Sequence, residues 1–129
     1  MNSFLANAQP ALLSILRIIT GFLFIQHGTQ KWLLYPGGTT RATVENLGGI
    51  AGLFELVGGA LIIVGLFTRP VAFVLSGVMA FAYFIAHAPQ GFWPLLNRGE
   101  LAVLYCFVFL YLAAAGGGPF SLDRALRRV

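Results

Sequence analysis

LGGIAGLFELVGGALIIVGLFTRPVAFVLSGVMAFAYFIAHA, residues 47–88, is the stretch of sequence that decides the fold. It contains two long apolar segments, and only the breaker Thr68-Arg69-Pro70 separates them. A helix needs about 20 mostly apolar residues to cross the hydrocarbon core of a bilayer, and each segment is about that long. Because the turn between them is very short, the two helices are predicted to be antiparallel neighbours.

The same pattern continues on both sides of this stretch. Further apolar segments cover residues 10–34 and 97–116, and glycine- and proline-rich loops separate them from the central pair. The sequence therefore predicts an all-α integral membrane protein, an antiparallel four-helix bundle that forms one domain over residues 1–129. The predicted spans are residues 10–34, 47–67, 70–88 and 97–116, and both termini are expected on the same side of the membrane.

The composition excludes several other classes of protein. Hydrophobic residues make up 58% of the chain and charged residues 9%, whereas a soluble domain is about 45–50% apolar and about 25% charged. The net charge of +4 is not arranged as a basic stripe with exposed aromatic residues, so we expect no nucleic-acid partner. Cys106 is the single cysteine, which excludes an intrachain disulfide and a dithiol redox pair.

The basic residues also predict the orientation in the membrane. With four crossings, the N-terminal side carries Arg69, Arg124, Arg127 and Arg128, and the opposite side carries Lys31, Arg41 and Arg98. Cytoplasmic loops carry an excess of Lys and Arg, so we expect a multi-pass protein of the bacterial inner (plasma) membrane with cytoplasmic termini.

Ionisable residues inside the predicted spans are the most informative feature of the chain, because each costs about 2.5–3.5 kcal/mol on insertion scales and usually faces the interior. At a rise of 1.5 Å per residue, Arg17 lies about 6 Å from its helix centre toward the cytoplasm. The others lie about 4–13 Å toward the outside; they are His27, Glu55, His87 and Glu100. We therefore expect an outward-facing polar pocket within the membrane, with Tyr83 on the same helix face as His87.

Each of these residues also has a simpler structural interpretation. Arg17 can neutralise Glu55, Lys31 can extend to the membrane interface, and Glu100 can stabilise the start of its helix. Tyr83 can be a packing residue. In the second span, the spacing Gly48-x-x-x-Gly52 favours close helix packing or, alternatively, self-association into a homo-oligomer.

If the pocket forms, two kinds of ligand fit its residue types. A metal such as zinc or iron can be held by His27, Glu55, His87 and Glu100, although no single helix shows the spacing that preassembles such a site. Alternatively, the pocket can bind the polar head of a quinone or another small amphiphile, with His and Tyr as hydrogen-bond donors and Glu as a proton carrier. A water-filled conduction path is a further alternative.

A series of motifs resembles the DoxX family of bacterial inner-membrane proteins. They are Arg17-x-x-x-Gly21, Gly28-x-x-Lys31, Gly52-x-x-Glu55-x-x-Gly58, Gly65-Leu66-x-Thr68-Arg69, His87, Asn97-x-Gly99-Glu100 and Gly118-Pro119-x-Ser121-Leu122-Asp123. The resemblance implies a four-helix protein of the plasma membrane. The family takes its name from a small subunit of a thiosulfate:quinone oxidoreductase, and some members are linked to membrane complexes that handle thiols and oxidative stress. By family position, Arg17, Glu55, His87 and Glu100 are the residues to test.

Together, these observations predict a subunit or accessory protein of a quinone- or thiol-linked redox system. The candidates for substrate binding or a proton relay are Arg17, His27, Glu55, Tyr83, His87 and Glu100. The chain has no recognised haem motif and no nucleotide-binding loop, so electrons must come through a bound cofactor, for which we consider quinone, or through an oxidoreductase partner protein. The alternatives are a structural or scaffolding membrane protein and a transporter of a small solute.

Overall fold

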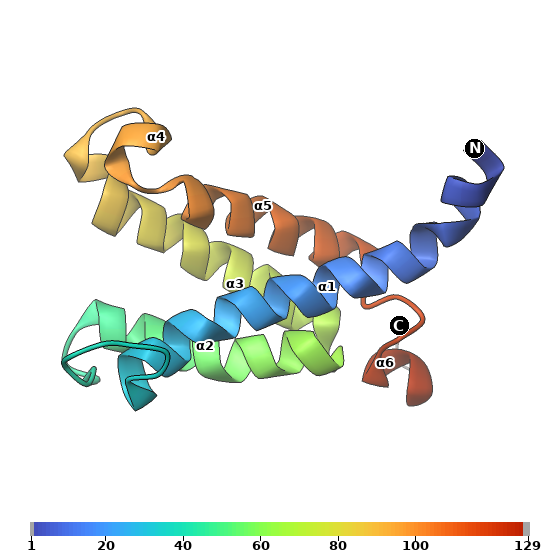
Figure 1. Ribbon diagram of the computed structural model, residues 1–129, viewed down its shortest axis with the longest axis horizontal. Coiled ribbons are helices and arrows are strands. Elements are labelled where there is room, and N and C mark those ends of the chain that lie inside the picture. The colour runs from blue at the N-terminus through green and yellow to red at the C-terminus, as the bar shows by residue number, and fades with distance from the viewer. Residues whose placement is uncertain (1, 128–129) are drawn as a thin grey trace.

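The computed structural model describes residues 2–127, and within that range it consists of helices and loops without a strand (Figure 1). The long helices are α1 (Asn2–Leu33), α2 (Leu47–Val64), α3 (Thr68–Ala82) and α5 (Glu100–Ala115). Shorter elements connect or follow them: the π-helix η1 (Tyr83–His87), the 3-10 helix η2 (Ala88–Gln90), α4 (Pro94–Asn97) and α6 (Leu122–Ala125).

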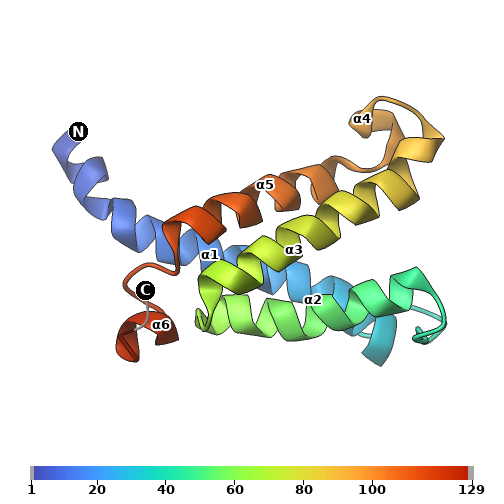
Figure 2. The same ribbon diagram turned by 180° about the vertical axis from the view of Figure 1, so that it is seen from behind.

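The long helices form two hairpins, α1 with α2 and α3 with α5. The hairpins approach each other at the end that holds the α2–α3 turn and α6, which we name the closed end (Figure 1). They diverge at the end that holds the α1–α2 loop and α4, which we name the open end; the reverse view shows the same arrangement (Figure 2). The start of α1 and the C-terminal α6 both lie at the closed end (Figures 1 and 2).

The ends of α2 follow from its capping residues. The side chain of Asn46 accepts a hydrogen bond from the backbone N–H of Gly49 (2.7 Å) and so begins the helix. Gly65 adopts a left-handed conformation (φ 72°), which ends the helix at Val64. The predicted end at residue 67 was therefore too late, because Gly65 terminates the helix before the apolar sequence ends.

The other helix bounds also differ from the prediction. Helix α1 begins at Asn2, since Pro10 is accommodated inside the helix. The fourth apolar segment is divided, because Arg98 adopts a left-handed conformation (φ 63°) that ends the short helix α4 before α5 begins at Glu100.

Three helical runs in the described residues are long and apolar enough to cross a membrane: 3–33, 47–64 and 68–90. Helix α5 is also apolar but has 16 residues, or about 24 Å at 1.5 Å per residue. The fold is therefore an all-helical bundle of the kind that membranes accommodate. Its outer surface is apolar, with exposed side chains such as Phe22, Phe73 and Phe107.

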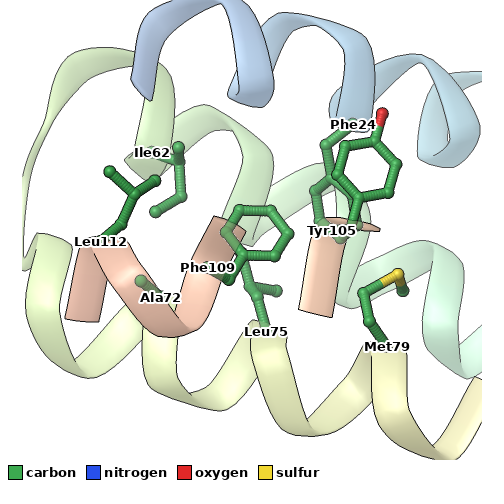
Figure 3. Close-up of a cluster of buried hydrophobic side chains, with 8 residues drawn as sticks. All are labelled: Phe24, Ile62, Ala72, Leu75, Met79, Tyr105, Phe109 and Leu112. Carbon is green, nitrogen blue, oxygen red and sulfur yellow. The ribbon is translucent and has the colours of Figure 1, made fainter. Parts of the chain in front are cut away.

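A core of large apolar side chains joins the two hairpins (Figure 3). Phe24 of α1 is fully buried and makes edge-to-face contacts with Tyr105 (centroids 5.2 Å apart) and Phe109 (4.9 Å) of α5. The remaining core residues come from α2, α3 and α5: Ile62, Ala72, Leu75, Met79 and Leu112. Phe24 therefore connects the α1–α2 hairpin to the α3–α5 hairpin.

Glycines allow α1 and α2 to approach closely. A Cβ atom on Gly28 of α1 would lie 2.8 Å from the carbonyl oxygen of Gly52 in α2, and one on Gly59 would lie 2.8 Å from Cβ of Ile25. These contacts confirm the close-packing interpretation for Gly52 but not for Gly48, which is exposed and where a Cβ atom would meet only the side chain of Asn46 at 3.5 Å.

This packing predicts different effects for the same substitution at two glycines. Gly28→Ala forces α1 away from α2 and should lower the unfolding free energy in detergent by about 1–3 kcal/mol, as overpacking does. The matched control is Gly77→Ala, because a Cβ atom at Gly77 of α3 meets nothing within 4 Å. That control should leave the unfolding temperature unchanged or raise it, since alanine favours helix. Thermal unfolding followed by circular dichroism measures both; equal unfolding temperatures would refute the role given to Gly28.

Candidate functional site

A cavity of about 560 Å³ lies between the two hairpins in the half of the bundle nearer the open end. Its walls are mainly apolar side chains of all four long helices, with Phe24, Phe54 and Met79 among them. The polar side chains that line it are His27, Lys31, Glu55, His87, Arg98 and Tyr105. The cavity therefore has apolar walls and a small group of polar and charged side chains.

Glu55 is buried, and its carboxylate accepts a hydrogen bond from the ammonium group of Lys31 at 2.8 Å. A Cβ atom on Gly52 would lie 3.1 Å from Cδ of Lys31, so the absence of a side chain at Gly52 gives the lysine stem room to reach Glu55. The expectation that Lys31 extends to the membrane interface was wrong, because a buried carboxylate attracts the ammonium group more strongly than the interface does.

Arg17 does not contact Glu55, and the expected pair between them was wrong. Its side chain is fully buried at the closed end. The guanidinium group donates hydrogen bonds to the carbonyl oxygens of Ile62 (2.9 Å), Phe120 (2.7 Å) and Gly117, and a longer one to that of Ile63 (3.4 Å). Several N–H donors in a fixed fork suit this set of carbonyls, and those of Ile62 and Ile63 belong to the last turn of α2, where a cation is favoured.

Two further charges complement helix ends at the closed end. The carboxylate of Asp123 accepts hydrogen bonds from the backbone N–H groups of Phe67 (2.8 Å) and Thr68 (2.9 Å) at the start of α3. The guanidinium group of Arg69 donates to the carbonyl oxygen of Ala114 at the end of α5. Arg17, Arg69 and Asp123 therefore stabilise helix termini, and none of them lines the cavity.

The ring of His87 is oriented by the chain segment that follows it. Its Nδ1 lies 3.0 Å from the carbonyl oxygen of Asn97. A carbonyl oxygen can only accept, so Nδ1 carries a proton, and in the tautomer with this proton alone Nε2 is a hydrogen-bond acceptor. The side chain of Asn97 is fully buried and fixes this segment through hydrogen bonds to the hydroxyl of Tyr83 (3.0 Å), the carbonyl of Gly91 (2.9 Å) and the N–H of Gly99 (2.8 Å).

His27 lies one helical turn before Lys31 on α1, and its ring packs edge-on against Tyr105 of α5, with centroids 6.0 Å apart. This contact places an imidazole on the cavity wall beside the Lys31–Glu55 pair. The structure thus brings His27, Glu55 and His87 to one cavity.

Two other candidates lie outside the cavity. Tyr83 is half-buried and binds Asn97, and Glu100 is exposed in the first turn of α5. The N-cap residue of α5 is Gly99, whose N–H donates to the side-chain oxygen of Asn97, and Glu100 is the acidic residue of the first turn, as the helix-start interpretation expected. Glu100 thus completes no cluster with the other acidic and imidazole groups, and within residues 2–127 no three His, Cys, Asp or Glu side chains are placed to hold a metal ion.

Lys31 and Arg98 also line the cavity, although the sequence pattern indicated a headgroup contact for Lys31 and only membrane orientation for Arg98. For Lys31 a signal was present, since Gly52 precedes Glu55 by three residues and leaves space on the same helix face. No such signal exists for Arg98, because its position depends on the backbone of the α4–α5 connection.

Chemically, the cavity offers both donors and acceptors to a bound molecule. Lys31 and Arg98 are cationic donors, while Nε2 of His87 is an acceptor. The apolar walls suit a ring or a hydrocarbon group. An amphiphile with a polar head therefore fits the cavity better than a free ion does.

Comparisons with known proteins place these features among membrane proteins. The profile of the DoxX family matches residues 12–88, more than half of the chain. An uncharacterised protein of Haemophilus influenzae is 45% identical and covers 92% of this chain and 93% of its own length. The Escherichia coli "Inner membrane protein YphA" is 31% identical, with 91% of each chain covered. The Bacillus subtilis protein named "Putative oxidoreductase CatD" is 27% identical over 84% of this chain and 82% of its own. No solved structure matches the chain significantly.

The geometry at the closed end predicts that Arg17 is a structural residue. Arg17→Met removes the donor to the carbonyls of Phe120 and Ile63 and one of two donors to those of Ile62 and Gly117. A buried carbonyl group without a donor costs about 1–3 kcal/mol, so the unfolding free energy should fall by at least about 2 kcal/mol. Arg41→Met, which removes an exposed arginine of the α1–α2 loop, is the matched control and should have little effect. Thermal and chemical unfolding in one detergent compare them, and similar stabilities of the two variants would contradict this role.

Proposed function

Because this chain belongs to the DoxX family, we propose that it is an inner-membrane accessory subunit of a quinone-linked redox system and that its cavity binds the quinone ring. The observation that carries the proposal is the arrangement of polar side chains in an otherwise apolar cavity at the open end. Lys31, Glu55, His27 and His87 come from three different helical segments and line the same cavity. Such a combination suits a flat apolar ring with oxygen atoms at its edge.

The donors and acceptors of the cavity match both redox forms of such a ring. A quinone carries carbonyl oxygens that need donors, and the ammonium group of Lys31 has N–H groups beyond the one that binds Glu55. A quinol carries hydroxyl groups that need acceptors, which Nε2 of His87 supplies. The same cavity can therefore hold the oxidised and the reduced molecule.

Electron transfer itself is assigned to a partner protein. Reduction of a quinone to a quinol consumes two electrons and two protons, and the side chains of this chain can exchange only the protons. Cys106 does not line the cavity; its sulfur lies 3.4 Å from the hydroxyl of Ser76. The electrons therefore pass between the bound ring and an oxidoreductase, a role in keeping with the name of the Bacillus subtilis relative.

We place the open end on the outer face of the membrane. Lys31 is neutralised by Glu55, so the open end keeps Arg41 and Arg98 as free basic residues. The closed end carries Arg69, Arg124 and Arg127, and Arg128 lies outside the described residues. The positive-inside rule then favours a cytoplasmic closed end with both termini, provided that α5 crosses the membrane as a fourth span.

This topology has a direct test. Fusions of green fluorescent protein to either terminus should fluoresce, and alkaline phosphatase inserted in the α1–α2 loop should be active, because the first folds in the cytoplasm and the second only outside it. Termini on opposite sides would mean an odd number of crossings and would show that α5 does not span the membrane.

Quinone binding predicts a difference between two matched carboxylate variants. Glu55→Gln removes the charge that holds Lys31 at the cavity wall and should weaken the binding of a water-soluble quinone about tenfold, a loss of about 1.4 kcal/mol. Glu100→Gln alters an exposed carboxylate outside the cavity and should leave the affinity unchanged. Quenching of tryptophan fluorescence in detergent measures the affinity, and mass spectrometry of the purified protein tests for a bound quinone.

The same measurements distinguish the scaffolding alternative. A protein without a ligand of its own should show no saturable quenching, and Glu55→Gln should then change only stability. Equal affinities of the Glu55 and Glu100 variants would likewise overturn the assignment of the cavity.

A further inference from the structure

A second hollow lies beside the cavity and is entirely apolar. It is a groove of about 420 Å³ between α2 and α3, and no polar residue lines it. Val57 of α2 and Val74 of α3 are 62% and 50% exposed, so no other part of the described chain covers these walls. At the floor of the groove, a Cβ atom on Gly58 would lie 2.6 Å from Cδ2 of Leu75, so the helices meet closely beneath it.

The groove continues the cavity along the same helix interface. Phe54 lines both hollows. On α2, the cavity is lined by residues from Leu47 to Glu55 and the groove by residues from Leu53 to Leu61. Helices α3 and η1 run antiparallel to α2, so the order is reversed: residues 70–75 line the groove, and residues 78–87 line the cavity. Together the two hollows follow α2 for about 21 Å at 1.5 Å per residue.

The change in chemistry along this path is abrupt. The polar side chains are confined to the cavity, and every residue that lines the groove is apolar. A molecule that fills both hollows therefore has a polar head and a long hydrocarbon tail. A hydrophilic ligand or a compact ring fills the cavity alone.

We propose that the groove between α2 and α3 binds the hydrocarbon tail of the amphiphile whose head occupies the cavity. This inference rests on the proposed function, and it names the substrate class more closely: long-tailed, prenylated quinones. Lipid tails are as apolar as the groove, so the tail increases the affinity through packing along a preformed surface. This increase in affinity should level off once the tail is longer than the groove.

The test compares two quinones that share one head, the first without a tail and the second with four prenyl units. Their affinities for the full chain in detergent are measured by quenching of tryptophan fluorescence; Trp32 donates a hydrogen bond to the carbonyl of Gly49, next to Gly48 of the cavity wall. We expect the tailed quinone to bind about tenfold more tightly. Lengthening the tail beyond four units should add nothing further.

A matched pair of variants separates groove binding from partition into detergent. Val57→Phe fills the groove, whereas Val64→Phe makes the same change on α2 outside it. Val57→Phe should remove most of the gain from the tail and leave the affinity for the tail-free quinone unchanged, while Val64→Phe should keep the gain. Unfolding temperatures of both variants, measured beside the wild type, show that each retains its fold.

The outcomes separate the two proposals. An equal gain from the tail in both variants, or a gain that keeps growing with tail length, overturns the tail groove and leaves the cavity assignment intact. Failure of either quinone to bind the wild type overturns the proposed function and this inference together.

Discussion

The fold depends on the solvation of one buried cation by backbone oxygen atoms, which accept its hydrogen bonds. Arg17 lies in apolar surroundings, where an uncompensated charge is costly, and carbonyl groups of α2 and of the segment before α6 surround its guanidinium group. The interaction ties α1 to the end of α2 and to the C-terminal segment at once. Asp123 at the start of α3 and Arg69 at the end of α5 extend the same logic, because each charge meets a helix terminus of opposite partial charge.

This arrangement divides the ionisable residues of the bundle into two groups with different tasks. The charged groups at the closed end form hydrogen bonds to backbone groups, so few of their donors and acceptors remain for a ligand. At the open end, Lys31 and Glu55 neutralise each other on the wall of a cavity, and His87 keeps one ring nitrogen free. The residues of the DoxX motifs therefore contact helix termini at one end and line the cavity at the other, which sequence order alone does not reveal.

The sequence predicted the helices well because apolar length and glycine or proline breakers are local signals. It also predicted that His27, Glu55, His87 and Glu100 face a common interior, since helix register determines which residues share a face. The first three line one cavity, whereas Glu100 lies outside it. The partners of the charges were not predictable in the same way. A sequence shows which side chains have opposite charge, so it favoured Glu55 as the partner of Arg17. It does not show which backbone carbonyls lie nearby, and those of Gly117 and Phe120 reach Arg17 only because of the conformation of residues 117–120. The position of Arg98 on the cavity wall depends likewise on the conformation of the turn after α4.

The divergence of the two hairpins has a mechanical consequence. Helix pairs fastened at one end behave as levers, in which a small pivot near the fastening is amplified toward the free tips. A rotation of about 5° displaces the far end of a helix about 24 Å long by about 2 Å. The pivot here is Arg17 with its carbonyl partners at the closed end. The separation of the hairpins near Lys31 and His87 therefore depends on contacts at the opposite end of the bundle.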